Sequence, residues 1–517
     1  MSFANGSRYV GWLLRTNRRL AVNSEFQVAR NFARAFRTDA EPGLAPSQIT
    51  RWEQGTTTAS REVVRRYEQL LEASPQSLVV LADTIRRSEA AGPLEVTDGR
   101  SDDQRLLYQY LDRVLAPGEM AGADWARLTE LIAGQPALVL YPPRLWCAIA
   151  EQVLSELVVS ENNAWLQRQE ALSRLLEHPI ARSHVVATCV ALAEDRSSPA
   201  VIEPVSLLDV VAHKDGNRYV LQQIENPSSD RARYAGLLAA VRKVRHGHFT
   251  SDEQFWLARV VQQAVADPAL DAATAPLLSQ VAALLDRRMA GQSAFPRRRW
   301  VPHSDALTAI GAVEYPPGAH SVSQRIADLA QCRLADDRHG RDAVLAELVG
   351  KALFDANPDV RLTATMLIAA TPYRDAVAAA LLAQLHSDLS RRVEEIAPSA
   401  LSTLTTFGVD IHRPLMRTLL IHDGSSADLR HAAAWATPHC AGVYPLHVWR
   451  RILAEQHGAW LRRPSATGES ILHGIAYGIG TDRHYELLAE LRQRGDLPDA
   501  VRQTAQWLLS SPPDSPA

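Results

Sequence analysis

A residue pair that recurs five times in the last third of the chain constrains the fold more than any other feature. In each pair an aliphatic residue is followed four positions later by alanine, and successive pairs are 29 to 43 residues apart. The pairs are Val360/Ala364, Val393/Ala397, Leu429/Ala433, Leu472/Ala476 and Val501/Ala505. Residues four apart share one face of a helix, and the small alanine lets a neighbouring helix approach closely. Because further helices are predicted between the pairs, such as Arg374–His386 and Pro445–Gln456, the pattern predicts helix pairs stacked as an α-solenoid.

The text around three of these pairs is also similar. It reads Asp359-Val360-Arg361, Asp428-Leu429-Arg430 and Asp499-Ala500-Val501-Arg502. An aspartate near a helix start interacts favourably with the helix dipole. These residues resemble HEAT repeats, in which an Asp, a Val-Arg pair and a following Ala recur in this way. The resemblance implies HEAT-like helical repeats over residues 321–510; irregular helical packing with a chance alanine spacing is the alternative.

The rest of the chain also has the periodicity of amphipathic helices, and the alternating pattern of half-buried strands is nearly absent. We therefore expect an all-α protein. A length of 517 residues suggests about three domains. The expected divisions are an N-terminal domain at 1–90, a linker at 91–103, a helical domain at 104–289, an irregular linker at 290–320, the repeats at 321–510 and a disordered tail at 511–517.

The most specific local signal is the segment Leu44–Gly55, which reads LAPSQITRWEQG. From Pro46 onward it resembles the recognition helix of the lambda-repressor/Cro-like helix-turn-helix family, also called XRE, with the typical text Pro-Ser-x-Ile-Ser-Arg-Trp-Glu-x-Gly. Helices predicted near Ser7–Leu20 and Ser24–Arg37 precede it, and one at Ser60–Leu71 follows it, as in that family. The resemblance implies that residues 1–90 form a helix-turn-helix domain that binds double-stranded DNA.

The residues of this segment divide into two faces. Ile49 and Trp52 are three positions apart and are expected to anchor the helix in the domain core, while the other side meets base edges in the major groove. Gln48 can pair bidentately with adenine, and Arg51 can pair with guanine or bind a phosphate. The DNA-binding candidates are Ser47, Gln48, Thr50, Arg51 and, from the preceding helix, Gln27.

Other positions of the segment have expected structural roles. Gly55 suits a left-handed helix C-cap, and Ser60 suits the N-cap of the next helix. Glu53 is expected to be structural, because an acid that faced DNA would be repelled. The chain departs from the family in the long connection Thr38–Ala45 and in having Ala59 where proline is frequent. The alternative for this domain is a helical bundle that contacts protein rather than DNA.

The charge distribution agrees with a local DNA-binding site. Residues 1–90 contain thirteen arginines and nine acidic residues, whereas the whole chain has a net charge of −3. A basic reading domain on an acidic body favours DNA binding by that domain alone.

No motif indicates an enzyme, a metal or a cofactor. The cysteines Cys147, Cys189, Cys332 and Cys440 are far apart and form no CxxC pair, so a disulfide framework or a zinc ribbon is not expected. His246-Gly247-His248 lacks a third metal ligand nearby in sequence. The glycines of HGIAYGIG, from Gly474 to Gly480, follow no strand, so they form no dinucleotide fingerprint.

Together these observations predict a sequence-specific transcription regulator, expected to be a repressor rather than an activator, that acts as a homodimer. Its C-terminal helical region is expected to sense a peptide, protein or small-molecule signal. No apolar run is long enough to span a membrane, and we expect a cytoplasmic protein. The alternative is a helical-repeat scaffold or adaptor that mainly binds other proteins.

Overall fold

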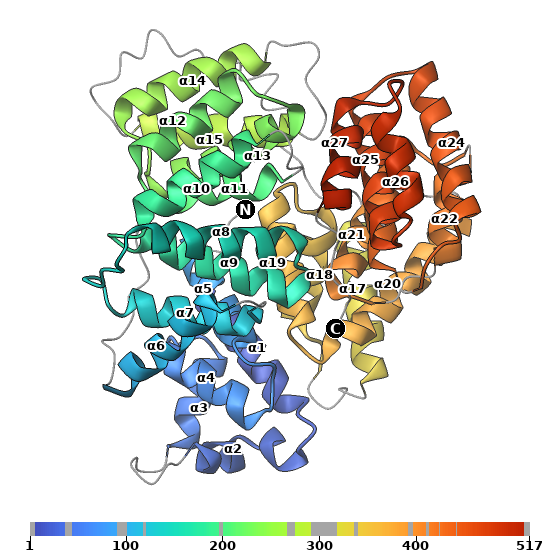
Figure 1. Cartoon of the computed structure of the whole chain (residues 1–517). Helices are drawn as coiled ribbons and strands as arrows, with labels where there is room; N and C mark the ends of the chain where they lie inside the picture. The colour runs from blue at the N-terminus through green and yellow to red at the C-terminus, as the bar shows by residue number, and fades with distance from the viewer. Residues whose placement is uncertain are drawn as a thin grey trace. The chain divides into compact units, whose positions relative to one another are not determined.

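The computed structural model describes residues 6–36, 44–89, 101–116, 120–195, 200–265, 274–290, 318–334, 340–390, 396–409, 413–422, 424–440 and 442–510. Within these ranges every regular element is a helix and no strand is formed (Figure 1). The predicted all-α class is confirmed. The predicted linkers at 91–103 and 290–320 lie mostly outside the described residues, and the predicted tail at 511–517 lies wholly outside them.

The chain divides into two compact units. Unit 1 comprises Met1–Glu194, Ala200–Glu314 and Ala370–Pro372, and unit 2 comprises Asp195–Pro199, Tyr315–Ala369 and Tyr373–Ala517. The predicted N-terminal domain and the predicted helical domain at 104–289 both lie in unit 1. The predicted repeats lie almost entirely in unit 2.

The described part of unit 1 consists of helices of six to seventeen residues and two short 3₁₀ segments. They are α1 (Gly6–Arg19), η1 (Ser24–Gln27), α2 (Ala29–Ala35), α3 (Pro46–Glu53), α4 (Arg61–Leu70), α5 (Ser77–Glu89), α6 (Ser101–Leu115), α7 (Gly122–Ala133), α8 (Arg144–Val159), α9 (Asn162–Glu177), α10 (Arg182–Glu194), α11 (Ile202–Leu207), η2 (Leu208–Val210), α12 (Lys214–Glu225), α13 (Asp230–His246), α14 (Ser251–Val265) and α15 (Ala275–Ala290).

The helix predicted over Ser24–Arg37 is interrupted. The Asn23 side chain accepts a hydrogen bond from the Glu25 N–H and starts the 3₁₀ turn η1. Val28 then takes an extended conformation, with φ −91° and ψ 115°, before α2 begins. The prediction of one continuous helix was therefore wrong, because the local cap at Asn23 and the extended Val28 divide the segment into two.

The helices from α6 to α15 share one continuous apolar core. Trp125 on α7 and Trp146 on α8 are among its largest fully buried side chains. The buried Glu156 carboxylate accepts hydrogen bonds from the Trp125 indole at 2.7 Å and from Arg168 at 3.0 Å. Each helix from α7 to α15 packs on a helix one or two places away in the chain, as α7 does on α9, α9 on α10 and α13 on α15, so this part of unit 1 is a layered stack of helices.

In its described residues, unit 2 has helices of nine to eighteen residues and one 3₁₀ segment. They are α17 (Ala319–Arg333), α18 (Ala343–Phe354), α19 (Pro358–Ala369), α20 (Tyr373–Ser390), α21 (Ala397–Phe407), α22 (Arg413–Ile421), α23 (Ala427–Ala436), η4 (Thr437–His439), α24 (Leu446–Arg462), α25 (Ala466–Thr481), α26 (Tyr485–Gln493) and α27 (Asp499–Ser510).

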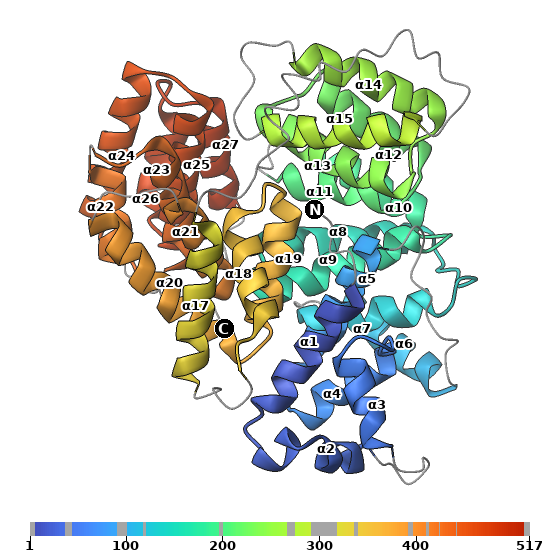
Figure 2. The same ribbon diagram turned by 180° about the vertical axis from the view of Figure 1, so that it is seen from behind.

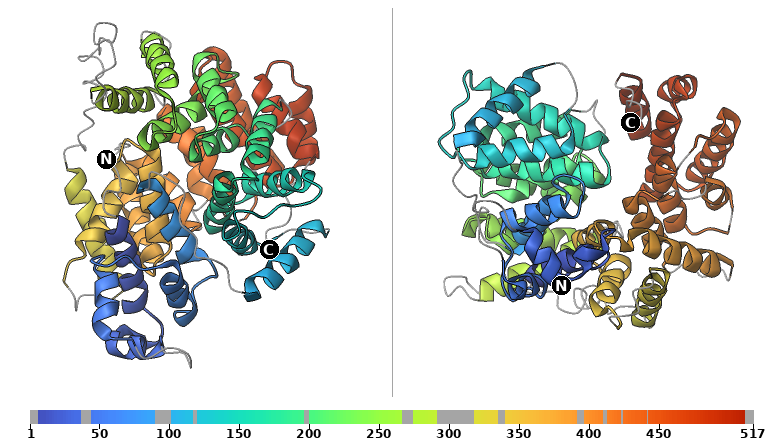
Figure 3. Two further views of the ribbon diagram at one scale, coloured as in Figure 1. Left: turned by 90° about the vertical axis from the view of Figure 1, so that its left-hand side faces the viewer. Right: turned by 90° about the horizontal axis from the view of Figure 1, so that it is seen from below.

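The five helices that carry or follow the recurring pairs form a series. Each of α19, α21, α23 and α25 packs on the next one, ending with α27. The intervening helices α20, α22, α24 and α26 each pack on the following member of that series, so unit 2 has two layers (Figures 1 and 2). Figure 3 shows these helices from two further directions. The paired residues in the described ranges are at most 4% exposed; Val393 lies outside those ranges.

The glycines of α25 are packing positions. A β-carbon at Gly478 would lie 2.5 Å from the Trp449 ring of α24, and one at Gly480 would lie 2.7 Å from Leu508 of α27. At Gly474 it would lie 3.2 Å from Ala434 of α23. These glycines therefore allow α25 to approach three neighbouring helices closely.

No single helix in the described ranges has the length and apolarity to cross a membrane. One bent pair, Pro358–Ala369 with Tyr373–Leu389, meets the length and composition criteria across a 119° bend.

Candidate nucleic-acid interface

The helix α3 is anchored by its apolar face, as the sequence predicts. Ile49 is fully buried and Trp52 is 9% exposed. The Trp52 ring lies 5.9 Å from that of Phe36, and Phe36 in turn contacts Tyr67 at 5.5 Å between ring centroids. This aromatic cluster joins α3 to the end of α2 and to α4, so α3 has a fixed inner face.

A buried ion pair holds the C-terminal end of α3. Arg18 of α1 donates two hydrogen bonds to the Glu53 carboxylate, at 2.6 and 2.8 Å. The Tyr67 hydroxyl donates a third at 3.1 Å. Burial and the Glu53 carboxylate raise the pKa of Tyr67 far above its usual value, so this hydroxyl remains a donor. The prediction that Glu53 is structural is confirmed.

Arg18 also fixes the segment before α2. Its remaining terminal nitrogen donates to the backbone carbonyls of Phe26 at 3.2 Å and Gln27 at 2.5 Å. One guanidinium therefore orients both α3 and η1 relative to α1. Nothing in the sequence pattern singled out Arg18, because a basic residue near a helix C-terminus usually has a simple dipole role.

Two glycines bring α1 and the end of α3 into backbone contact. A β-carbon added at Gly11 would lie 2.7 Å from the carbonyl oxygen of Trp52 and 2.8 Å from that of Glu53. Gly55 has φ +69°, as predicted for a left-handed cap, and its added β-carbon would lie 2.6 Å from the Ser7 carbonyl oxygen. The position of α3 therefore depends on the absence of side chains at both sites.

Replacing Gly11 with alanine is expected to lower the free energy of unfolding by about 1–3 kcal/mol, because the methyl group overlaps two backbone carbonyls. The measurement is denaturant unfolding followed by circular dichroism. Gly458→Ala in α24 is the matched control, since its added β-carbon meets only Arg462, at 3.5 Å. The control should be neutral or stabilising, because alanine favours a helix interior over glycine. Equal behaviour of the two variants would show that α1 and α3 are not packed as described.

The outer face of α3 carries most of the DNA-binding candidates. Ser47, Thr50 and Arg51 are exposed, at positions i, i+3 and i+4 of one helical face, and Gln48 is half-buried. The Thr50 hydroxyl donates to the Pro46 carbonyl at 3.3 Å. The structure thus places these four residues on one short helix whose opposite face is anchored in the core.

Gln27 lies on a different element from the other candidates. It is the exposed last residue of η1, which packs on α1 and α2. Its side-chain amide donates to the Ala21 carbonyl at 3.1 Å, which closes the turn between α1 and η1. This bond gives Gln27 a structural role in the turn.

Two exposed arginines near α3 were missed by sequence reasoning. Arg30 and Arg34 lie four positions apart on α2, which packs directly on α3. Their i, i+4 spacing beside the candidate helix was a signal for a shared basic face. The predicted long connection Thr38–Ala45 lies, up to residue 43, outside the described residues.

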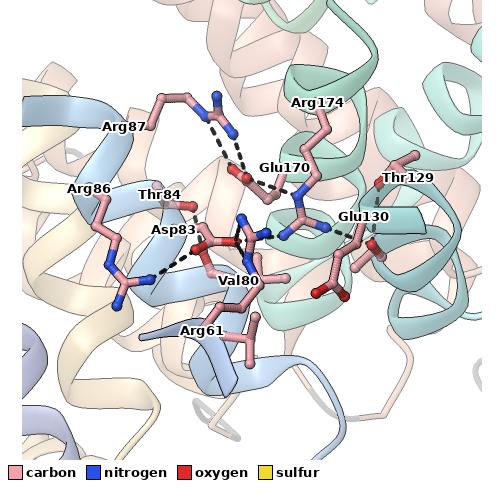
Figure 4. A network of polar contacts seen from close by, with 12 residues as sticks. Arg61, Val80, Asp83, Thr84, Arg86, Arg87, Thr129, Glu130, Glu170 and Arg174 are labelled. Atoms are coloured by element: carbon pink, nitrogen blue, oxygen red, sulfur yellow. Dashed lines mark hydrogen bonds and ion pairs between the residues drawn. The ribbon is translucent and has the colours of Figure 1, made fainter. Parts of the chain in front are cut away.

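The N-terminal helices are joined to the body of unit 1 by buried charges, shown in Figure 4. Asp83 of α5 accepts hydrogen bonds from Arg61 of α4 at 2.9 Å and from Arg174 of α9 at 2.8 Å. Arg87 of α5 donates to Glu170 of α9 at 2.6 Å. These buried ion pairs join α4 and α5 to α9, so they attach the N-terminal helices, α3 included, to the rest of unit 1.

Within the described residues, no group of three or more histidine, cysteine, aspartate or glutamate side chains has a geometry that could hold a metal ion. No protein-family model, curated protein or solved structure matches the chain.

Proposed function

We propose that the chain binds double-stranded DNA in a sequence-specific manner and regulates transcription, with α3 as the reading helix. The observation that carries the proposal is the division of α3 into two faces. Ile49, Trp52 and Glu53 are buried and fixed, while Ser47, Thr50 and Arg51 are exposed. A helix that enters the major groove needs this arrangement, because it must be held rigidly and still present polar side chains to base edges.

The exposed side chains have the chemistry for base and phosphate contacts. Arg51 presents a guanidinium that can donate two hydrogen bonds to guanine, and Gln48 can both donate to and accept from adenine. Arg30 and Arg34 on α2 are suited to phosphates that flank the groove. The position before α3 is Ala45, which has no side-chain acceptor, and the first helix residue, Pro46, has no N–H. The Gln48 N–H donates to the Ala45 carbonyl at 2.9 Å, and the Ser47 N–H is suited to a phosphate oxygen.

For unit 2 we propose a HEAT-like solenoid that receives the signal. The serial packing from α19 to α27 supports this proposal, since helical repeats contact mainly their neighbours and present extended surfaces to peptides or proteins. The same series would equally suit the alternative, a scaffold that mainly binds proteins. Selection of a specific DNA sequence by the full-length chain would favour the regulator over the scaffold.

Arg51→Ala and Gln48→Ala are each expected to weaken specific DNA binding by about 1–3 kcal/mol without loss of helicity, because each removes a base contact. A binding sequence is first selected from a random duplex pool with the full-length wild-type chain. Fluorescence anisotropy at fixed salt then compares the variants on that duplex, since affinity for DNA depends strongly on salt.

Arg218→Ala is the matched control, because it removes one exposed arginine from α12, far along the chain from α3. It should bind as the wild type does. If both α3 variants retain wild-type affinity, α3 does not read bases. If no sequence is enriched from the pool at all, the scaffold function is favoured instead. For the expected homodimer, the enriched sequence should be an inverted repeat with half-sites about 34–36 Å, or a multiple of this, apart.

A further inference from the structure

A cysteine and a histidine from two helices of unit 1 lie in contact, away from α3. Cys147 belongs to the first turns of α8, and His184 belongs to the first turn of α10. The Cys147 Sγ atom lies 3.5 Å from the His184 Nδ1 atom, within hydrogen-bonding distance for sulfur. Both side chains are half-buried, so the pair is partly open to solvent.

The geometry gives the thiol a proton acceptor. The S–H group can donate to a neutral Nδ1, and the resulting imidazolium can then donate a proton to a leaving group. Helices α8 and α10 pack on each other, and the next residue after His184 is the fully buried Val185. The ring of His184 is therefore held beside the sulfur by the packing of two helices.

The other cysteines have different surroundings. Cys189 is fully buried, and burial raises its pKa to about 12. Cys440 is also buried, and its thiol donates to the Ala436 carbonyl at 3.3 Å. Cys332 is exposed on α17. Cys147 thus combines access to small reagents with a histidine base, and the exposed Cys332 serves as an internal reference.

We propose that Cys147 and His184 form a reactive thiol site whose reagent is a small hydroperoxide. His184 accepts the Cys147 proton, and the thiolate attacks one oxygen of the peroxide. The S–O bond forms as the O–O bond breaks, and the proton held by His184 goes to the departing alkoxide or hydroxide. Sulfur is oxidised by two electrons to the sulfenic acid, and the hydroperoxide is reduced to an alcohol or to water.

A small-molecule thiol can reverse this modification. Its sulfur forms a disulfide with the Cys147 sulfenic acid, water leaves, and a second equivalent of thiol then releases Cys147 by thiol–disulfide exchange. The site would let the body of unit 1 report the level of peroxide. This proposal does not depend on DNA binding, since neither residue belongs to the N-terminal helices.

The test is treatment of the full-length chain with hydrogen peroxide, followed by a dione probe that labels sulfenic acids and by peptide mass spectrometry. At pH 7 we expect Cys147 to be labelled at least tenfold faster than Cys332 in the same molecules. His184→Asn should lower the Cys147 rate about tenfold or more at pH 7. At pH 10, where an ordinary thiol with a pKa near 8.5 ionises without help, wild type and variant should react at similar rates.

A structural role for His184 predicts a different pattern. If the substitution only loosened the packing of α8 on α10, Cys147 would become more accessible and its rate would rise at both pH values. That result, or equal labelling of Cys147 and Cys332 in the wild type at pH 7, overturns the proposal. Thermal unfolding of His184→Asn is measured in parallel, and Ser183→Ala, at the neighbouring exposed position, is the control that should leave the Cys147 rate unchanged.

Discussion

Asp83→Ala is expected to destabilise unit 1 by about 3–5 kcal/mol, because it removes the carboxylate partner of the buried Arg61 and leaves the buried Arg174 in an ion pair with Glu170 alone. The Asp83 side chain is 1% exposed and forms ion pairs with Arg61 and Arg174, whose side chains are 9% and 2% exposed. Arg86 is a third partner at 3.3 Å. Hydrogen-exchange mass spectrometry should show lost protection in the peptides of α5 and α9, while the peptides of unit 2 remain protected.

The control for this variant is Asp215→Ala, which removes an exposed ion pair with Arg218 on α12. The two side chains of that pair are 58% and 68% exposed, so the expected change is within about 0.5 kcal/mol. Equal protection of α5 in Asp83→Ala and Asp215→Ala would contradict the described attachment of the N-terminal helices to the body.

The contribution of Asp83 to the stability of unit 1 should depend on pH. Burial alone would raise the pKa of Asp83, but Arg174 and Arg61 outweigh it and hold the pKa below the usual value. The ionised carboxylate therefore contributes stability above the unfolded-state pKa, about 3.9, and that contribution is lost as the pH falls through the folded-state value. The stability difference between wild type and Asp83→Ala should shrink below about pH 4.

Asp482→Ala is expected to have a comparable effect on unit 2, again about 3–5 kcal/mol. The Asp482 carboxylate, at the end of α25, accepts hydrogen bonds from Arg413 at 2.7 and 2.9 Å. It also accepts the backbone N–H of Tyr444 and the indole N–H of Trp449, each at 2.8 Å. One carboxylate therefore joins α22, α24, α25 and the segment before α24.

Loss of this carboxylate would leave the buried Arg413 guanidinium with the Cys440 carbonyl but without its counter-ion, and would remove the acceptor of two buried N–H groups. The fluorescence emission of Trp449 and its quenching should change. The peptides of α22 and α24 should lose protection against amide hydrogen exchange. Glu490→Ala is the matched control, since its ion pair with Arg450 is nearly half exposed on both sides. If Asp482→Ala is as stable as this control, the buried network does not support the two-layer packing of unit 2.

Buried residues could be predicted from the sequence where apolar residues recur with the period of a helix. The pairs Leu472/Ala476 and Val501/Ala505 are fully buried because an aliphatic residue and an alanine four positions apart occupy one helix face. Trp52 and Gly55 were likewise predicted correctly, since each has a local reason, an anchoring face and a left-handed cap. The break at Val28 was not predicted, because a cap at Asn23 competed with a continuous helical pattern.

The buried charges could not be assigned from sequence, because the partners are distant in the chain. Asp83 and Arg174 are 91 positions apart, and Arg413 and Asp482 are 69 apart. The position of Asp83 did indicate a buried ion pair. It lies inside the apolar run from Leu78 to Ile85, where an ionised group requires a partner. The identity of that partner depends on helix packing and not on local pattern.

If the exposed face of α3 reads DNA bases, substitutions on that face should change the base sequence that the protein prefers. Binding sequences are selected from a random duplex pool by the full-length wild type, by Gln48→Ala and by Arg51→Ala. Each contact to a base edge specifies one position, so each variant should relax the preference at its own base pair and keep the preference at the others. Selection of one unchanged sequence by all three proteins, or of none by the wild type, would show that α3 does not read bases.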